Sequence, residues 1–223
     1  MPANARALVL AFVSGFVDTA VFVAMGGLFV AHVTGNFVLL GATLAGATSG
    51  GAHEGAATLQ LIAFPVFFIS AMLAPAIAAR VPPQRGTLVL LALATLLLVL
   101  GAVAALLGLQ PKAVIALGFA SAMGLLNAAH RMDAKLGPPF TVMTGNVTAI
   151  AIEAAHRLGL APTTREGPVG APAATMLALV IAFALGCAVG ALVERALGLG
   201  AMLLPSALLA LALLAPIERR RDG

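Results

Sequence analysis

Charged residues are scarce in this sequence, and two aromatic residue types are missing. Of the 223 residues, 9% are charged and 61% are hydrophobic, and the mean hydropathy is +1.10. Because soluble domains carry about 25% charged residues, this chain cannot cover a surface that faces water. Trp and Tyr, which usually mark the interfaces of membrane proteins, are both absent. Phe and Arg are therefore the residues left to anchor the chain at the interfaces.

The chain also lacks the residues that most enzymes and metalloproteins need. Its single cysteine, Cys187, lies in an apolar run, which excludes a disulfide framework and a thiolate zinc site. The sequence contains no nucleotide-binding loop, no His/Cys cluster with metal-ligand spacing and no nucleophile motif. We therefore expect no enzymatic activity, no catalytic residue, no bound metal and no cofactor.

Long apolar runs predict an all-α polytopic membrane protein with a single membrane domain, residues 1–223. Each run approaches or exceeds the ~20 residues that a bilayer-spanning helix needs; the runs cover residues 59–79, 87–109, 173–193 and 197–216. The apolar N-terminal run carries Asp18 and continues past any plausible cleavage point, so we expect a first membrane helix there and not a signal peptide. The lipid bilayer is thus the expected environment.

The high isoelectric point, about 10.6, does not indicate nucleic-acid binding. The twelve Lys and Arg residues are scattered over the loops between the apolar runs. This is the distribution that sets the orientation of membrane proteins. We expect no nucleic-acid partner.

The two halves of the chain resemble each other, which predicts a first repeat at residues 1–110 and a second at residues 111–223. The segment "LVLAFVSGFVDTA" from Leu8 aligns with "LGFASAMGLLNAA" from Leu117. With one residue inserted, the Thr-Gly-Asn tripeptide at 34–36 then aligns with the same tripeptide at 144–146. Each half reads as a helix, a Thr-Gly-Asn segment and two further helices.

The charge distribution favours six transmembrane helices and two re-entrant half-helices. Residues 34–48 and 144–157 would form helices of roughly 21–23 Å at 1.5 Å per residue, short of a ~30 Å hydrocarbon core. If both are re-entrant, ten of the twelve basic residues lie inside and only Lys112 and Arg195 lie outside. The result is a 3+3 inverted repeat in a bacterial inner membrane, with both termini cytoplasmic.

The two tripeptides are candidates for the two halves of one solute site near the membrane midplane, where inverted-repeat transporters bind their substrates. Thr is a good helix N-cap, Gly permits close approach of the backbone, and Asn offers both donors and an acceptor. Two positive helix ends suit a small polar or anionic solute. The alternative is that the tripeptides only cap two helices buried against protein. The residues expected to bind the solute are Thr34, Gly35, Asn36, Thr144, Gly145, Asn146 and Asn127.

Asp18 is the most informative single residue, because an acid at membrane depth is costly unless it is paired, hydrated or protonated. We expect it to couple transport to a proton or cation; the alternative is a structural acid bound to backbone N–H groups of a re-entrant segment. Its counterpart in the second half is the neutral Asn127. His32 could titrate beside it or simply pack. Phe29 and Phe140 precede the tripeptides and are candidates for gating or for core packing.

Two further features are expected to be structural. Gly186 and Gly190 form a GxxxG pair, which typically serves helix packing in membranes. His130 lies next to Arg131, so we expect it near an interface.

The segments "SGFVDTAVF", "LFVAHVTGNFVLLG" and "GLLNAAHRMDAKLGPPFTVMTGNVT" together resemble the YoaK-like family of bacterial inner-membrane proteins, over nearly the whole chain. The resemblance implies a multi-pass bacterial membrane protein and no particular activity. This chain departs from the pattern of the family at one position, because members usually show Gln-Asn where it has Leu126-Asn127.

The sequence therefore predicts a small secondary transporter for a small polar or anionic solute, with Asp18 making a proton the candidate coupling ion. A passive channel for a small solute or ion is the first alternative, and a non-transporting membrane scaffold is the second. Gly-rich helix faces are also compatible with a homodimer.

Overall fold

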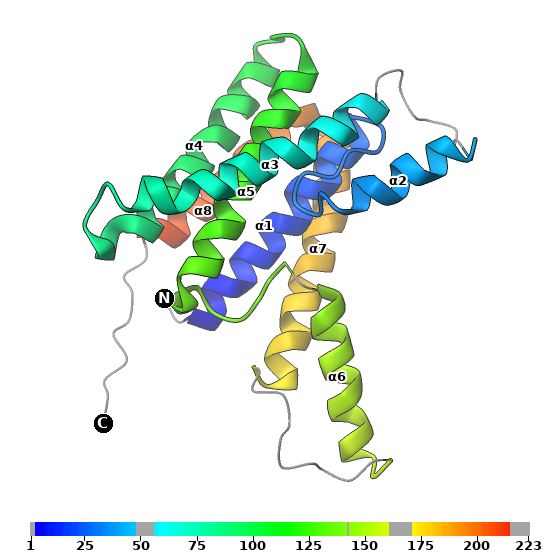
Figure 1. Cartoon of the computed structure of the whole chain (residues 1–223), viewed down its shortest axis with the longest axis vertical. Helices are drawn as coiled ribbons and strands as arrows, with labels where there is room; N and C mark the ends of the chain where they lie inside the picture. The colour runs from blue at the N-terminus through cyan, green and yellow to red at the C-terminus, as the bar shows by residue number, and fades with distance from the viewer. Residues whose placement is uncertain (1–2, 48–55, 142, 161–170, 215–223) are drawn as a thin grey trace.

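The computed structural model describes residues 3–47, 56–141, 143–160 and 171–214 (Figure 1). These residues form helices and turns and contain no strand. The α-helices are α1 (Ala3–Ala24), α2 (Gly35–Leu44), α3 (Ala56–Ala78), α4 (Gly86–Leu106), α5 (Lys112–Met132), α6 (Met143–Arg157), α7 (Ala173–Leu197) and α8 (Leu203–Leu214). Three short 3-10 helices complete the list: η1 (Pro83–Arg85), η2 (Ala134–Leu136) and η3 (Gly198–Met202).

Five helical segments of the described chain are long and apolar enough to cross a membrane. Four of them centre on α1, α3, α4 and α5, and the fifth, residues 173–214, contains both α7 and α8. The chain turns back at η3 within this last segment, so that α8 returns beside α4 (Figure 1). Large apolar side chains are exposed on the outer helices, such as Val38 at 74% and Leu44 at 90%. The protein is therefore a polytopic helical membrane protein, since bilayer lipid is the solvent that suits such a surface.

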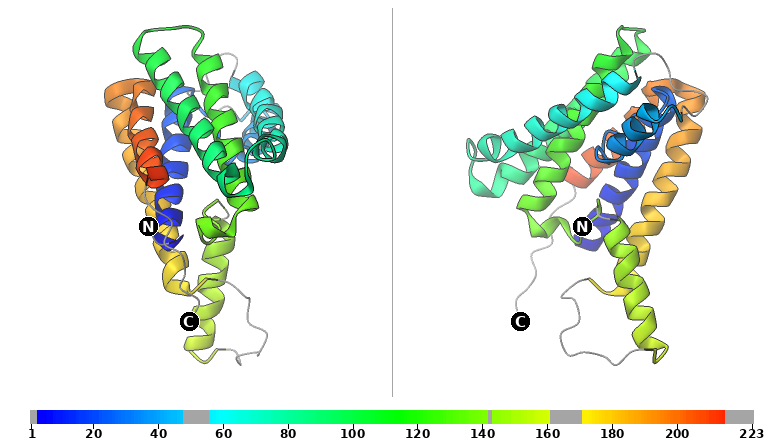
Figure 2. Two further views of the ribbon diagram at one scale, coloured as in Figure 1. Left: turned by 90° about the vertical axis from the view of Figure 1, so that its left-hand side faces the viewer. Right: turned by 45° about the vertical axis from the view of Figure 1, so that its right-hand side comes forward.

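The helices α1 and α5 form the interior of the bundle. In each of them 61% of the most apolar 18-residue stretch is buried, against 11% in α3. The helix α1 packs mainly against α7, whereas α5 packs against α3 and α4. Figure 2 (left) shows α1 lying between the pair α7 and α8 on one side and the pair α4 and α5 on the other. The short helices are peripheral, because α2 packs on α3 and α6 packs on α7.

Glycines allow the helices to cross closely at two places. A Cβ atom at Gly186 would meet the carbonyl of Phe12, and one at Gly190 would meet the carbonyl of Phe16. The predicted role of this GxxxG pair in helix packing is thus confirmed. Gly124 of α5 lies in the same way against the carbonyl of Phe67 on α3. Close backbone approach of this kind is how membrane helices associate where the lipid is as apolar as the side chains.

Short helices occur where the two tripeptides predict them. The helix α2 begins at Gly35 and α6 begins at Met143, and both start near the middle of the molecule and run apart (Figure 1). The chain before each helix is irregular and turns at a glycine with positive φ, at Gly27 (φ 111°) before α2 and at Gly137 (φ 99°) before α6. Glycine is required there because other residues rarely adopt such angles. We call residues 25–34 the first loop and residues 137–141 the second loop.

The crossing of α1 and α7 predicts that Gly186→Ala is destabilising. The added methyl group would push against the Phe12 carbonyl, and overpacking of this kind typically costs about 1–3 kcal/mol. The thermal midpoint should be followed by loss of helical circular dichroism, since the chain has no Trp or Tyr to report unfolding. The matched control is Gly118→Ala on α5, where a Cβ meets no atom within 4 Å. Equal midpoints for the two variants would contradict this account of the crossing.

Candidate functional site

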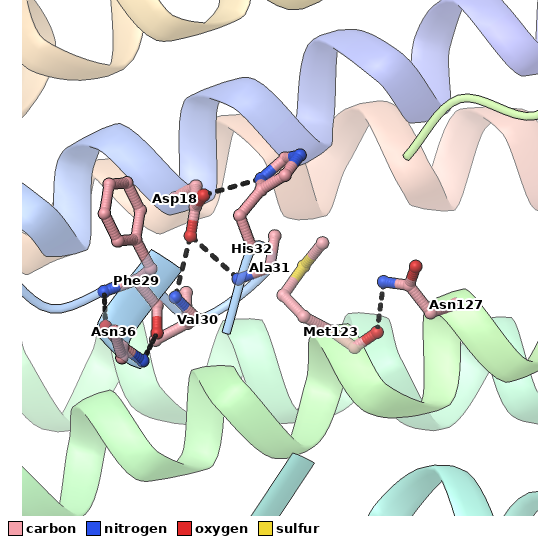
Figure 3. Close-up of polar contacts among 8 residues, drawn as sticks. All are labelled: Asp18, Phe29, Val30, Ala31, His32, Asn36, Met123 and Asn127. Carbon is pink, nitrogen blue, oxygen red and sulfur yellow. Dashed lines mark hydrogen bonds and ion pairs between the residues drawn. The ribbon is translucent and has the colours of Figure 1, made fainter. Parts of the chain in front are cut away.

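The carboxylate of Asp18 is the centre of a buried hydrogen-bond network (Figure 3). Its Oδ1 atom accepts the backbone N–H groups of Val30 (2.7 Å) and Ala31 (2.8 Å) in the first loop. Its Oδ2 atom lies 2.8 Å from Nδ1 of His32. Asp18 is 3% exposed, so the carboxylate itself lies away from the molecular surface. The two backbone bonds are those that a structural acid would make, and the contact with His32 is additional to them.

His32 connects this network to two other parts of the molecule. Its ring packs edge-on against Phe183 of α7, with ring centroids 5.2 Å apart. The ring also interacts with the main chain of Thr141 in the second loop. The first loop, the second loop, α1 and α7 therefore meet at one histidine. The side chain is 31% exposed, which leaves it partly open to its surroundings.

The asparagines of the two tripeptides each hold the loop that precedes them. The Oδ1 atom of Asn36 accepts the N–H of Phe29, and its Nδ2 donates to the Phe29 carbonyl, both at 2.9 Å. The Nδ2 atom of Asn146 donates to the carbonyl of Pro139 at 3.0 Å, again seven residues back. Proline has no N–H, so the reciprocal bond is missing in the second half. Both asparagines are buried, at 0% and 6% exposure.

The start of α2 has few free backbone donors. The N–H groups of residues 35–37 donate to the carbonyls of residues 32–34, at 2.8, 3.3 and 3.1 Å. Thr34 is exposed, and its hydroxyl makes no capping bond. Thr144 and Gly145 are likewise exposed at the start of α6. The side chains of the two threonines are therefore the accessible polar groups of the tripeptides.

The second loop is held by a different residue from the first. Asn127, the counterpart of Asp18, donates to the carbonyl of Met123 in its own helix at 2.8 Å and not to the loop (Figure 3). His130 contacts the loop instead, since its Nε2 atom lies 3.1 Å from the carbonyl oxygen of Gly137 and 3.2 Å from that of Pro138. The side chain of His130 is buried, although its position next to Arg131 in the sequence had led us to expect it near an interface.

The two phenylalanines that precede the tripeptides are packed. Phe140 is fully buried, and its ring lies edge-on to His130 with centroids 4.7 Å apart. Phe29 packs against Phe22 of α1 at 4.8 Å and also against Gly35, where a Cβ would come within 2.9 Å of its ring. Each ring therefore fixes the position of its loop.

Gln60 is a member of this network that sequence reasoning missed. Its Nε2 atom donates to the carbonyl of Gly27 at 2.7 Å, which ties the first loop to α3. The residue is 5% exposed, and its Oε1 atom has no hydrogen-bond partner among the described residues. The sequence signal that could have identified Gln60 is that its amide stands alone within the apolar run 59–79.

The network brings a carboxylate and an imidazole into contact. Within the part of the chain that the structure describes, no three His, Cys, Asp or Glu side chains lie close enough together to hold a metal ion. A carboxylate and an imidazole in contact can share or exchange a proton. Because both backbone bonds to Asp18 require an acceptor, protonation of the carboxylate would weaken the hold on the first loop.

A family model described as "Protein of unknown function (DUF1275)" matches residues 6–215. The chain belongs to this family. The region that matches the DUF1275 family includes Asp18, His32 and both tripeptides, so the network lies within the shared part of the chain. No curated protein and no solved structure matches the chain.

The network predicts that the two counterparts Asp18 and Asn127 differ in their contribution to stability. Asp18→Ala leaves two buried N–H groups without an acceptor, at about 1–3 kcal/mol each. Asn127→Ala removes one bond within a helix and should cost about 1 kcal/mol. Thermal midpoints in detergent, compared for the two alanine variants, test this difference. A loss at Asp18 no larger than the loss at Asn127 would argue against the network.

Proposed function

We propose that this protein is a small secondary transporter of the bacterial inner membrane, which moves a small polar or anionic solute and uses a proton as the coupling ion. The observation that carries the proposal is the contact of the buried Asp18 carboxylate with the partly exposed His32, at 2.8 Å. Ionisable side chains inside membrane segments are expensive, and they typically serve ion or proton pathways.

We further propose that residues 1–110 and 111–223 are inverted repeats, each with three spans and one re-entrant helix, α2 or α6. Reciprocal packing supports this, because the first long helix of each half packs on the second long helix of the other half: α1 on α7 and α5 on α3. At both crossings a glycine, Gly15 or Gly124, lies against a phenylalanine carbonyl, of Phe183 or Phe67. The same plan recurs in transporters with broken helices.

The orientation with both termini in the cytoplasm is part of the proposal. Lys112 at the start of α5 and Arg195 at the end of α7 would be external, and the other basic residues internal. Membership of the YoaK-like group within the family and a homodimeric assembly are both compatible with this arrangement.

In this proposal the two loops form the part that moves. Protonation of Asp18 removes the negative charge that holds Val30, Ala31 and His32, so the first loop is released. Because His32 also contacts Thr141, the second loop responds to the same event. The phenylalanines 29 and 140 close the site when the loops are held. The exposed Thr34 and Thr144 are the groups that contact solute, while Asn36 and Asn146 position the loops.

Proton coupling predicts that Asp18→Asn abolishes uptake driven by a pH gradient. Asparagine still accepts the N–H groups of Val30 and Ala31 but cannot bind and release a proton, so folding is retained while coupling is lost. Proteoliposomes containing a pH-sensitive dye would be offered a panel of labelled small amino acids, organic acids and glycerol. Proton entry that depends on solute should fall at least tenfold in Asp18→Asn and in His32→Gln.

Glu153→Gln is the control, because it also removes a carboxylate but in an exposed ion pair with Arg157. It should transport as the unmodified protein does. Full proton-driven uptake in Asp18→Asn, at an unchanged thermal midpoint, would refute the coupling role. Fast downhill flux that ignores the pH gradient would indicate a channel instead, and absence of flux for the whole panel would favour a scaffold.

A further inference from the structure

Four helices of the bundle form a ring that does not include the two loops. The helix α1 packs on α8, α8 packs on α4, α4 packs on α5, and α5 returns to α1. The ring has two ends: α1 and α4 begin at one end, and α5 and α8 begin at the other. We refer to these four helices as the ring.

A cavity of about 170 Å³ opens at the end of the ring where α5 begins. It is lined by Ala24 at the end of α1, by the turn between α4 and α5, and by the glycines of η3. A cavity of about 150 Å³ admits benzene, a molecule of six heavy atoms. A small amino acid such as alanine also has six heavy atoms, so the volume suits a solute of that size.

Two opposite charges line this cavity without forming an ion pair. Lys112 stands at the start of α5, and Glu194 stands on the last turns of α7. Their charges interact, yet no nitrogen–oxygen distance between them is within 4.0 Å. An ammonium group and a carboxylate that are held apart across one cavity present complementary partners to the two ends of a zwitterion. Charge-assisted hydrogen bonds of this kind are stronger than neutral ones.

A smaller cavity, about 30 Å³, lies at the opposite end of the ring. It too is lined by one base and one acid, Arg6 at the start of α1 and Asp133 at the end of α5. Thr87 donates to Asp133 at 2.8 Å, so part of this end is closed by a hydrogen bond. The cavity at each end of the ring is thus lined by one basic and one acidic side chain, and one cavity is larger than the other.

An unpartnered polar group lies on α1 between the two cavities. Leu10 lines the smaller cavity and Ala24 the larger one. Ser14 falls on the same face of the helix, which is turned away from α7. Its side chain is fully buried, and its hydroxyl oxygen has no hydrogen-bond partner among the described residues. A buried hydroxyl without a partner is unfavourable, and a polar solute passing through the ring would supply one.

We propose that the ring is the solute pathway and that its wider cavity binds a small zwitterion, with the carboxylate on Lys112 and the ammonium group on Glu194. The inference rests on the proposed transport function, but it places the solute in the ring instead of at Thr34 and Thr144, and it adds the class of solute. Asp18 follows Ser14 by one turn of α1, and its carboxylate is held by the first loop and His32, so a change in its charge can move the helix that lines the route.

The binding test uses labelled L-alanine with the purified full-length protein in nanodiscs. We expect saturable binding that weakens at least tenfold in Lys112→Gln and in Glu194→Gln. Arg195→Gln is the matched control, since it removes a base from the same end of α7 but does not line the cavity. Acetate and methylamine, which each carry one of the two charges, should compete at least tenfold less well than alanine.

Absence of alanine binding, or equal competition by acetate alone with no effect of Glu194→Gln, would overturn the zwitterion site. The proposed transport function would survive either result if another solute still enters in a manner that depends on Asp18. Conversely, alanine binding that depends on both charges, in a protein without proton-driven flux, would support the site and refute the coupled transporter.

The pathway has its own test in Ser14→Ala. Removing a buried hydroxyl without a partner should leave the thermal midpoint unchanged or raise it, and alanine binding at the wider cavity should persist. Alanine flux in proteoliposomes should nevertheless fall at least fivefold. Ser70→Ala, which removes a hydroxyl that bonds to Ser121 outside the centre of the ring, serves as control and should keep full flux. Undiminished alanine flux in Ser14→Ala would place the route elsewhere.

Discussion

The need to satisfy the irregular backbone of the two loops inside a helix bundle governs this structure. Buried N–H and carbonyl groups that water does not reach must find their partners within the protein. One carboxylate, that of Asp18, accepts two of these N–H groups and the ring nitrogen of His32. The amides of Asn36 and Gln60 satisfy three more backbone groups in the same loop. The fold of the first loop therefore depends on a few polar side chains that its own helices and α3 deliver.

The hydrogen bonds that Asp18 accepts also explain why a charge is tolerated in the centre of α1. A buried carboxylate is costly alone but is stabilised when it accepts several hydrogen bonds. The cost and the benefit are tied to one proton, because the carboxylate loses its advantage as an acceptor when it becomes neutral. The charge of Asp18 and the fold of the first loop therefore depend on each other.

The sequence was informative where local patterns decide the structure. The Thr-Gly-Asn tripeptides marked the starts of α2 and α6, and the spacing of Gly186 and Gly190 marked a helix crossing. The individual partners of Asp18 were harder to predict from the sequence, since they lie 12 to 14 residues away in an irregular loop. Nothing in the tripeptide itself indicates that its asparagine bonds to the residue seven positions earlier. Such bonds depend on loop conformation, which has no period that a pattern could reveal.

The proline at position 139 makes the two halves mechanically different. In the first half Asn36 clamps its loop with two hydrogen bonds, whereas Pro139 offers Asn146 a carbonyl and no donor. With one clamp bond fewer, the second loop is the more compliant of the two. Thermal energy alone would displace it further than the stiffer first loop. Two loops that precede similar short helices thereby differ in how easily they yield.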